Sequence, residues 1–228
     1  MDRLILFDVD FTLMNIPELG EKIFPPAFAE VYGVNDCYLR TGEIVGLTDW
    51  GIIIMFMEST GMDRKEIEKK LPDAMRSVTK FFNVNVEKDL RQFVLPGVRE
   101  LLASLKKEGM NLGLLTGNIE EVAWEKMRRA GLDGIFSFGG FGGYAEKRED
   151  LPPIAKEMAE RKFGKKFPMR EMVIIGDTPN DIKCAKANGA KSIGVCTGPF
   201  SEKQLKDAGA DLVVASLREL TPEKIRML

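Results

Sequence analysis

The chain has 228 residues, enough for one large α/β domain or for a core with a smaller second domain. A net charge of −2 and a sequence pI near 5.5 exclude a general electrostatic surface for nucleic acid. The sequence contains no histidine, which excludes mechanisms that need an imidazole base and zinc sites that need imidazole ligands. Acid–base chemistry therefore falls to carboxylates, Lys, Tyr or a metal-bound water.

The cysteines and the lengths of the apolar runs indicate the cellular compartment in which the protein is expected. Cys37, Cys184 and Cys196 form no CxxC pair, which favours free thiols in a reducing compartment; metal ligation or a structural disulfide is the minor alternative. The apolar run at Leu4–Phe7 is too short for a signal peptide, and Ile52–Met57 is too short to span a bilayer. We expect a cytoplasmic protein, monomeric or homodimeric, that binds neither membrane nor nucleic acid.

The first predicted element is a strand over Leu4–Phe7, because a parallel strand buried on both faces is almost wholly apolar. The segment Asp8-Val9-Asp10-Phe11-Thr12 follows directly, and the alternation of a strand points Asp8 and Asp10 to the same side. Two carboxylates so placed can act as one ionised, metal-bound group and one protonated donor. The alternative is that they cap a turn or a helix.

Residues 15–89 are predicted to be helical and too long to be one crossover helix. Helices are expected over Gly20–Tyr32, Thr48–Ser59 and Arg64–Phe82. This pattern favours an all-α cap, residues 15–89, inserted into a core of residues 1–14 and 90–228. The alternative is that these helices simply cover one face of the sheet.

From Leu95 onward, predicted strands and helices alternate. Helices are expected over Val98–Lys107 and Glu120–Ala130, with a strand at Leu112–Leu115 between them. The strand ends at Thr116-Gly117-Asn118, where a hydroxyl and the backbone amides of a helix start can bind an oxyanion or a phosphate. Ordinary helix capping is the alternative.

The next strand is predicted at Ile135–Ser137, followed by the glycine-rich residues 139–143. We interpret these glycines as a flexible loop, because no Lys-Ser/Thr follows and the spacing of a nucleotide-binding turn is absent. The remaining predicted elements are a helix over Pro152–Phe163, a strand over Val173–Ile175, a helix over Asn180–Asn188, a strand over Ser192–Cys196, a helix over Ser201–Ala208, a strand over Leu212–Ala215 and a final helix.

Repeated strand–helix units of this length predict an α/β fold with a Rossmann-like, three-layer core around a parallel sheet. Asp177 and Asp181 follow the Val173–Ile175 strand, so they are expected at the same sheet edge as Asp8 and Asp10. Ligands of open α/β sheets bind at that edge. Carboxylates gathered there require a cation or a shared proton, which implies a hard metal ion.

Three blocks, each after a predicted strand, resemble the motifs of the haloacid dehalogenase (HAD) superfamily over nearly the whole chain. They are Asp8-Val9-Asp10-Phe11-Thr12, Thr116, and Gly176-Asp177 with Asp181. The stretch from Leu95 to Asn118 is similar to phosphoglycolate-phosphatase-like members. Phe11 departs from the family, in which Gly is common at this position. The cation of the third motif is assigned to Arg148, with Lys147 as the alternative.

The resemblance implies a Mg²⁺-dependent phosphatase that hydrolyses a small phosphate monoester through an aspartyl-phosphate. In that scheme Asp8 is the nucleophile and Asp10 the acid–base, and Asp8, the Asp10 carbonyl and Asp177 are the metal ligands. The phosphoryl oxygens would be bound by Thr116, Gly117, Asn118 and Arg148, with Asp181 orienting Arg148 or a metal-bound water.

Other branches of the superfamily remain alternatives. A mutase shares the helical cap and all four Asp positions, a phosphonate hydrolase would need a cap Lys, and a catalytically silent binding protein would keep only the fold. Dehalogenases lack the second Asp of the first motif, so Asp10 argues against that activity. In the cap, Thr48 and Asp49 are candidate contacts to a small phosphorylated metabolite, whereas Trp50 is better explained as core packing.

Overall fold

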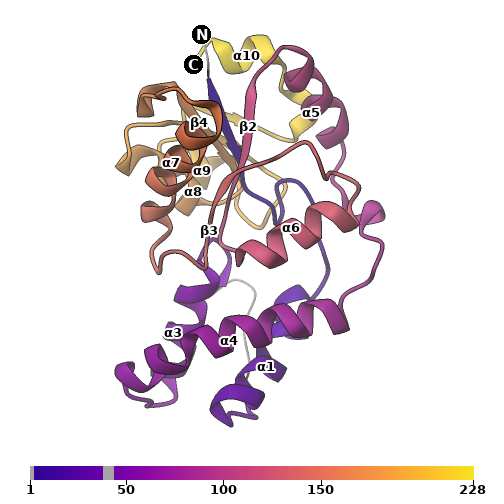
Figure 1. Ribbon diagram of the computed structural model, residues 1–228. Coiled ribbons are helices and arrows are strands. Elements are labelled where there is room, and N and C mark those ends of the chain that lie inside the picture. The colour runs from indigo at the N-terminus through magenta and orange to yellow at the C-terminus, as the bar shows by residue number, and fades with distance from the viewer. Residues whose placement is uncertain (1–2, 38–43) are drawn as a thin grey trace.

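The computed structural model describes residues 3–37 and 44–228 and has an α/β core with a parallel six-stranded sheet (Figure 1). The strand order is β3-β2-β1-β4-β5-β6, and every neighbouring pair is parallel. This confirms the predicted fold class. The strands are β1 (Leu4–Phe7), β2 (Asn111–Thr116), β3 (Gly139–Phe141), β4 (Met172–Gly176), β5 (Lys191–Val195) and β6 (Leu212–Val214).

The apolar strands are buried on both faces. In β1, Ile5 and Phe7 belong to one hydrophobic cluster, and Leu4 and Leu6 belong to another on the opposite face. Helices cover the two faces, so alternate side chains of one strand reach different cores. The core helices are α5 (Val98–Lys107), α6 (Glu120–Arg129), α7 (Leu151–Phe163), α8 (Pro179–Ala187), α9 (Glu202–Asp207) and α10 (Pro222–Arg226).

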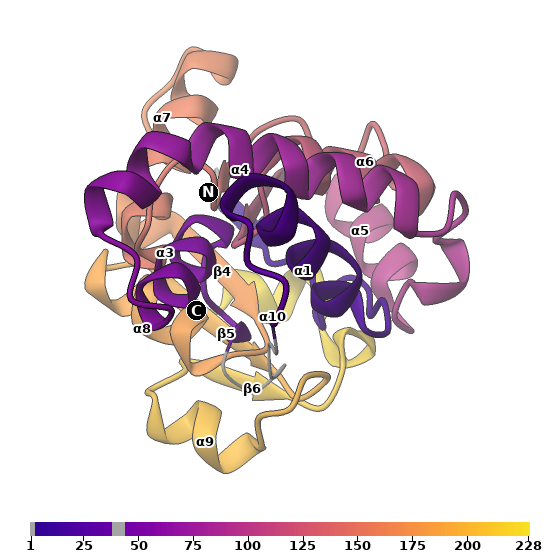
Figure 2. The ribbon, with the colours of Figure 1, turned by 90° about the horizontal axis from the view of Figure 1, so that it is seen from below.

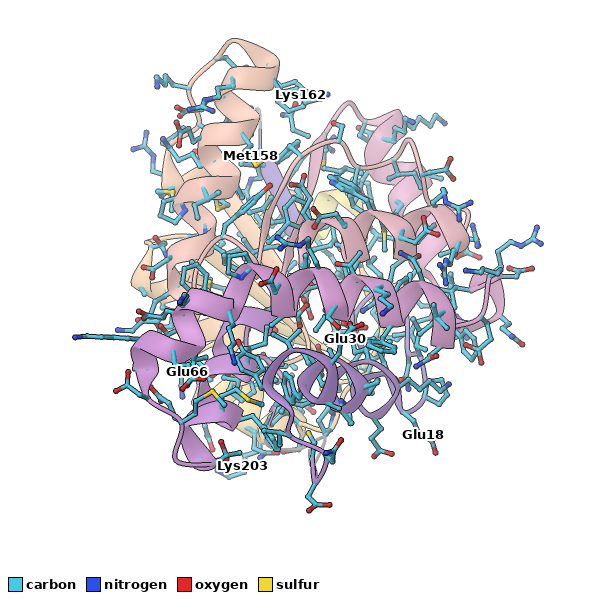
Figure 3. The ribbon with its side chains drawn as sticks, turned by 60° about the horizontal axis from the view of Figure 1, so that its bottom comes forward. Glu18, Glu30, Glu66, Met158, Lys162 and Lys203 are labelled. Carbon is cyan, nitrogen blue, oxygen red and sulfur yellow. The ribbon has the colours of Figure 1, made fainter. Side chains whose placement is uncertain are left out.

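A helical insert follows β1 and lies at the end of the sheet where β1 and β2 finish (Figures 1 and 2). It contains α1 (Leu19–Tyr32), α3 (Asp49–Ser59) and α4 (Arg64–Asn85). Glu30 of α1 accepts hydrogen bonds from Ser77 and Lys80 of α4, which ties the two helices together (Figure 3). This position favours the interpretation that the insert is a cap. It argues against the alternative that these helices simply cover one face of the sheet.

The two chain segments that join the insert to the core pair with each other. The amide of Asn15 donates to the carbonyl of Phe93 at 3.0 Å, and the amide of Leu95 donates to the carbonyl of Leu13 at 3.0 Å. Met14 and Val94 form an antiparallel bridge between them. The outgoing and returning segments are thus joined as a short antiparallel ladder.

Two predictions about the region after α6 were wrong. Ile135–Ser137 is not a strand; the edge strand is β3, which begins at Gly139 inside the segment expected to be a flexible loop. Gly139 and Gly140 pack so closely that a Cβ atom would lie 2.8 Å from the Leu114 carbonyl oxygen and 2.6 Å from that of Leu151, respectively. These glycines therefore serve close packing.

Within the described residues, no helix is both long and apolar enough to cross a membrane.

Candidate active site

The three central strands end at one place. Phe7 is level with Leu114 of β2 and with Ile175 of β4, so Asp8, Thr116 and Asp177 emerge at the same edge. The amide of Asp8 extends the pairing by donating to the Ile175 carbonyl at 2.9 Å. The strand order reverses beside β1, which is where open α/β sheets leave a crevice for ligands.

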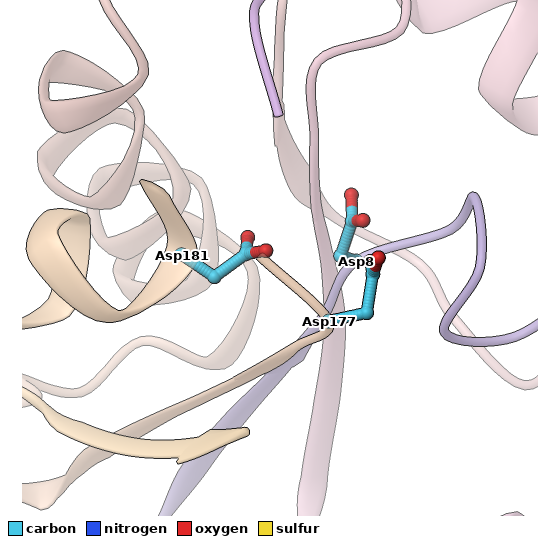
Figure 4. Close-up of side chains that lie close together, drawn as sticks. All are labelled: Asp8, Asp177 and Asp181. Carbon is cyan, nitrogen blue, oxygen red and sulfur yellow. The ribbon is translucent and has the colours of Figure 1, made fainter. Parts of the chain in front are cut away.

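Asp8, Asp177 and Asp181 form a buried carboxylate cluster (Figure 4). One carboxylate oxygen from each lies within 4.8 Å of the others. Burial and the neighbouring carboxylates raise the pKa of Asp177 to about 9. Burial also raises the pKa of Asp8 to about 7, although Arg148 acts in the opposite direction. The cluster therefore holds protons that a cation could displace.

One carboxylate oxygen of Asp177 could act as a ligand of a cation. Its Oδ1 accepts a hydrogen bond from the Thr12 hydroxyl at 3.3 Å, but its buried Oδ2 has no hydrogen-bond partner. A buried carboxylate oxygen without a partner is costly. Oxygen ligands of this kind are those that hard divalent cations prefer, so the residues present fit a metal site.

Arg148 lies inside the cluster, whereas Lys147 is exposed. The Arg148 Nη2 atom is 2.8 Å from Asp8 Oδ1 and 2.5 Å from Asp181 Oδ1. Burial alone would lower the pKa of Arg148, but the carboxylates of Asp181 and Asp8 outweigh it and raise the pKa. Of the two cations considered from the sequence, the structure brings Arg148 to the site.

Asp181 is committed to hydrogen bonds on both of its oxygens. Besides Arg148, it accepts from the Thr178 amide at 3.1 Å and from the Thr178 hydroxyl at 2.7 Å. Thr178 in turn caps α8, so the helix start holds Asp181 in place. The position of Asp181 suits orientation of Arg148 better than direct ligation of a metal.

The loop after β2 contacts the helical insert. Asp49, the first residue of α3, donates its amide to the Gly117 carbonyl at 2.7 Å and accepts from the Ile119 amide on Oδ2 at 2.8 Å. Gly117 fits only because it has no side chain: a Cβ atom would lie 2.0 Å from the Leu47 carbonyl oxygen. Burial raises the pKa of Asp49 to about 7. Asp49 thus joins the insert to the loop that contains Thr116.

The structure gives Thr48 and Trp50 structural roles. The Thr48 hydroxyl donates to the Glu146 carbonyl at 2.6 Å and accepts from the Gly51 amide at 2.9 Å, so it is fully used in capping α3 against the core. Trp50 packs against the main hydrophobic cluster. Neither residue is among those that line the cavity described below, so Thr48 is a poor candidate for substrate contact.

Sequence reasoning missed Lys126. This lysine of α6 is fully buried, and its Nζ atom lies 2.7 Å from both side-chain oxygens of Asp10 and 2.6 Å from Asn118 Oδ1. One signal was available: Lys126 follows Val122 by four residues and therefore falls on the buried stripe of the helix.

A cavity of about 280 Å³ connects the carboxylate cluster with the insert. Its core wall contains Asp8, Asp10, Arg148, Asp177 and the loop from Thr116 to Asn118. Its wall on the insert side is largely apolar. Its apolar side chains include Ile16, Leu19, Ile23, Phe24 and Ile52, and Phe11 of the core adds another to the cavity.

Comparisons with known proteins agree with this geometry. A phosphoglycolate phosphatase of Pseudomonas putida is 23% identical over 97% of this chain and 79% of that protein. A phosphoglycolate phosphatase of Neisseria meningitidis is 26% identical over 95% of this chain and 91% of that protein. The crystal structure of a β-phosphoglucomutase from Clostridium difficile has the same fold, with a TM-score of 0.73 and 18% identity over 100% of this chain and 96% of that one.

The family model described as "Haloacid dehalogenase-like hydrolase" matches residues 5–195, which include all four aspartates at the sheet edge. The chain therefore belongs to the haloacid dehalogenase-like hydrolases.

Proposed function

We propose that the protein is a Mg²⁺-dependent phosphatase that hydrolyses a small phosphate monoester through a phosphorylated Asp8. The observation that carries the proposal is the buried constellation of Asp8 beside Arg148 and next to the partner-free Oδ2 of Asp177. A carboxylate nucleophile, a cation for the phosphoryl group and a metal site are the parts that such a reaction needs.

Each step of the mechanism can be assigned to side chains or backbone amides of this protein. Asp8 attacks phosphorus, and Asp10 gives a proton to the leaving oxygen and later removes one from the attacking water. The Thr116 hydroxyl, the amides of Gly117 and Asn118, and Arg148 bind the phosphoryl oxygens. Asp181 keeps the Arg148 guanidinium pointed at that group.

Asp8, the Asp10 carbonyl and Asp177 would hold Mg²⁺, which when bound neutralises charge on the phosphoryl oxygens and on the clustered carboxylates.

We expect Mg²⁺-dependent release of phosphate from p-nitrophenyl phosphate, and we expect EDTA to abolish that release. If the wild-type protein releases no phosphate from any ester at any Mg²⁺ concentration, the proposal is wrong.

Mg²⁺ should also raise the unfolding temperature, and more so at higher pH. Without metal, the folded protein binds more protons than the unfolded chain, because the pKa values of Asp8 and Asp177 are raised from 3.8 to about 7 and about 9. Stability without metal therefore falls as pH rises through this range. Mg²⁺ needs both carboxylates ionised, so the shift measured by thermal unfolding should grow from pH ~6 to pH ~9. A shift that shrinks over that range would contradict the site.

The cavity favours an organic group that is apolar and carries no second anion. Among the described residues that line it, Arg148 is the sole basic side chain, and Arg148 is already assigned to the phosphoryl group. Glu18 and Asp49 add acidic side chains on the insert side of the cavity. A second phosphate or a carboxylate would find no counter-ion among these described residues, which disfavours a mutase that acts on a bisphosphate.

We therefore expect kcat/KM for propyl phosphate to exceed that for phosphoglycolate by about tenfold or more, a difference of ~1.4 kcal/mol. Leu19→Arg, which adds a cation to the cavity wall, should lower the ratio of kcat/KM for propyl phosphate to kcat/KM for phosphoglycolate. Val84→Arg, on an exposed position of α4, is the matched control and should leave the ratio unchanged. A wild-type preference for phosphoglycolate would reject this substrate class while leaving the phosphatase assignment intact.

A further inference from the structure

The buried ammonium of Lys126 has a complete set of partners. A charged group inside a protein is stable only when it is paired and hydrogen-bonded. Lys126 Nζ can donate three hydrogen bonds, and it has three acceptors at 2.6–2.7 Å: both Asp10 side-chain oxygens and Asn118 Oδ1. The whole hydrogen-bonding capacity of this lysine is therefore directed at Asp10 and the loop after β2.

Asp10 is fixed from one side and open on the other. Asn118 Nδ2 donates to Asp10 Oδ2 at 3.0 Å, so Lys126 and Asn118 hold the same carboxyl group together. The Asp10 side chain keeps 29% of its surface exposed, and it lines the cavity. The orientation of the Asp10 carboxyl group toward the cavity is thus set by Lys126 of α6 and by Asn118 of the loop after β2.

Packing alone does not explain a lysine at this position. The other buried positions along α6 include Val122, Ala123 and Met127, and an apolar side chain would fill the site of Lys126 without the cost of a buried charge. Nor does the reaction as described above assign any task to this residue. The contact with Asp10 is what distinguishes it.

We propose that Lys126 is a positioning residue for Asp10, an inference that rests on the proposed phosphatase function. By its hydrogen bonds to both side-chain oxygens of Asp10 it fixes the orientation of that carboxyl group toward the cavity. When the bond from phosphorus to the ester oxygen breaks, the Asp10 proton passes to that oxygen and leaves a carboxylate beside Lys126. When water attacks the phosphorylated Asp8, Asp10 takes the water proton and the charge disappears again.

The effect of Lys126 should therefore depend on the leaving group. An alkoxide such as that of propyl phosphate needs the Asp10 proton, whereas p-nitrophenolate leaves without one. Because kcat/KM reports the first transfer, from ester to Asp8, the two esters separate proton donation from every other contribution. A purely structural role for Lys126 would affect both substrates alike.

The test compares Lys126→Met with the wild-type protein on both esters. We expect kcat/KM for propyl phosphate to fall by about 10²–10³-fold and that for p-nitrophenyl phosphate by less than about tenfold. Lys126→Arg, which keeps the charge, should recover part of the loss on propyl phosphate. The matched control is Arg129→Met, which removes the other buried cation of α6, one that bonds Glu125 and the Val86 carbonyl. Any loss of activity in that control should be equal on the two esters.

A double mutant gives a second, independent readout. In an Asp10→Asn background, Lys126→Met should change kcat/KM for propyl phosphate by less than about threefold, because residues that act as a unit are not additive. Equal losses on both esters, or full additivity with Asp10→Asn, would overturn the role of Lys126 while leaving the phosphatase function standing. If the wild-type protein hydrolyses neither ester, the proposed function fails and this inference fails with it.

Discussion

Asp8→Asn is expected to lower kcat for phosphate release by about 10⁴-fold or more. An amide oxygen is a poor nucleophile, so no phosphorylated enzyme can form at this position. The substitution should not destabilise the fold, because Asp8 is buried and its raised pKa of about 7 shows that the folded protein disfavours the charge. Without metal at pH ~8, Asp8→Asn should be at least as stable as the wild-type protein.

This combination separates a lost nucleophile from a damaged fold. Phosphate release and thermal unfolding would be measured on the same preparations, and incubation with substrate would be followed by mass spectrometry for an added phosphoryl group. The wild-type protein should acquire the group transiently and Asp8→Asn should not. If the variant keeps more than about 1% of the wild-type kcat, Asp8 is not the nucleophile.

Arg148→Met is expected to reduce both activity and stability. The phosphoryl group loses its cation, which should lower kcat/KM by about 10²–10³-fold. The fold loses the buried partner of Asp8 and Asp181, and breaking a buried ion pair by removing one member typically costs about 3–5 kcal/mol. Lys147→Met, the exposed neighbour, is the matched control and should change the free energy of unfolding by less than about 0.5 kcal/mol.

The cost of Arg148→Met should depend on pH. With its pKa of about 7, Asp8 is largely neutral in the folded wild-type protein below that pH, so there the variant loses mainly the ion pair with Asp181. Above that pH the ionised Asp8 also loses its counter-ion. The destabilisation, measured by chemical denaturation without metal, should therefore grow from pH ~6 to pH ~8. An effect that is constant over this range would mean that Asp8 and Arg148 do not form an ion pair.

The main parts of the site could be predicted because they leave a pattern in the sequence. Asp8 and Asp177 each follow a short run of apolar residues, which is typical of a buried strand, and parallel strands end at a common edge. The helical insert was also predictable, since its helices are long and periodic. Helix α4 nevertheless extends to Asn85, three residues beyond the predicted end at Phe82.

Other parts left no such pattern. Two of the three residues of β3 are Gly139 and Gly140, which pack closely against backbone, and a short segment rich in glycine looks like a loop. The partner of Asp10 lies 116 residues away on a helix, and a single Lys among charged neighbours looks like a solvated face. Long-range partners of one charge are set by tertiary packing, which periodicity does not reveal.

The ladder between the two connecting segments limits how the insert can move. Because Met14 and Val94 are paired, we expect the two connecting segments to move together when the insert moves. The hydrogen bonds of Asp49 with Gly117 and Ile119 lie where the insert meets the loop after β2. We expect movement of the insert away from this loop to break the amide hydrogen bonds of Asp49 and Ile119, and also that of Trp50, whose amide donates to the Gly142 carbonyl at 3.2 Å. The rates of hydrogen exchange at the amides of Asp49 and Ile119 would report how readily this contact opens.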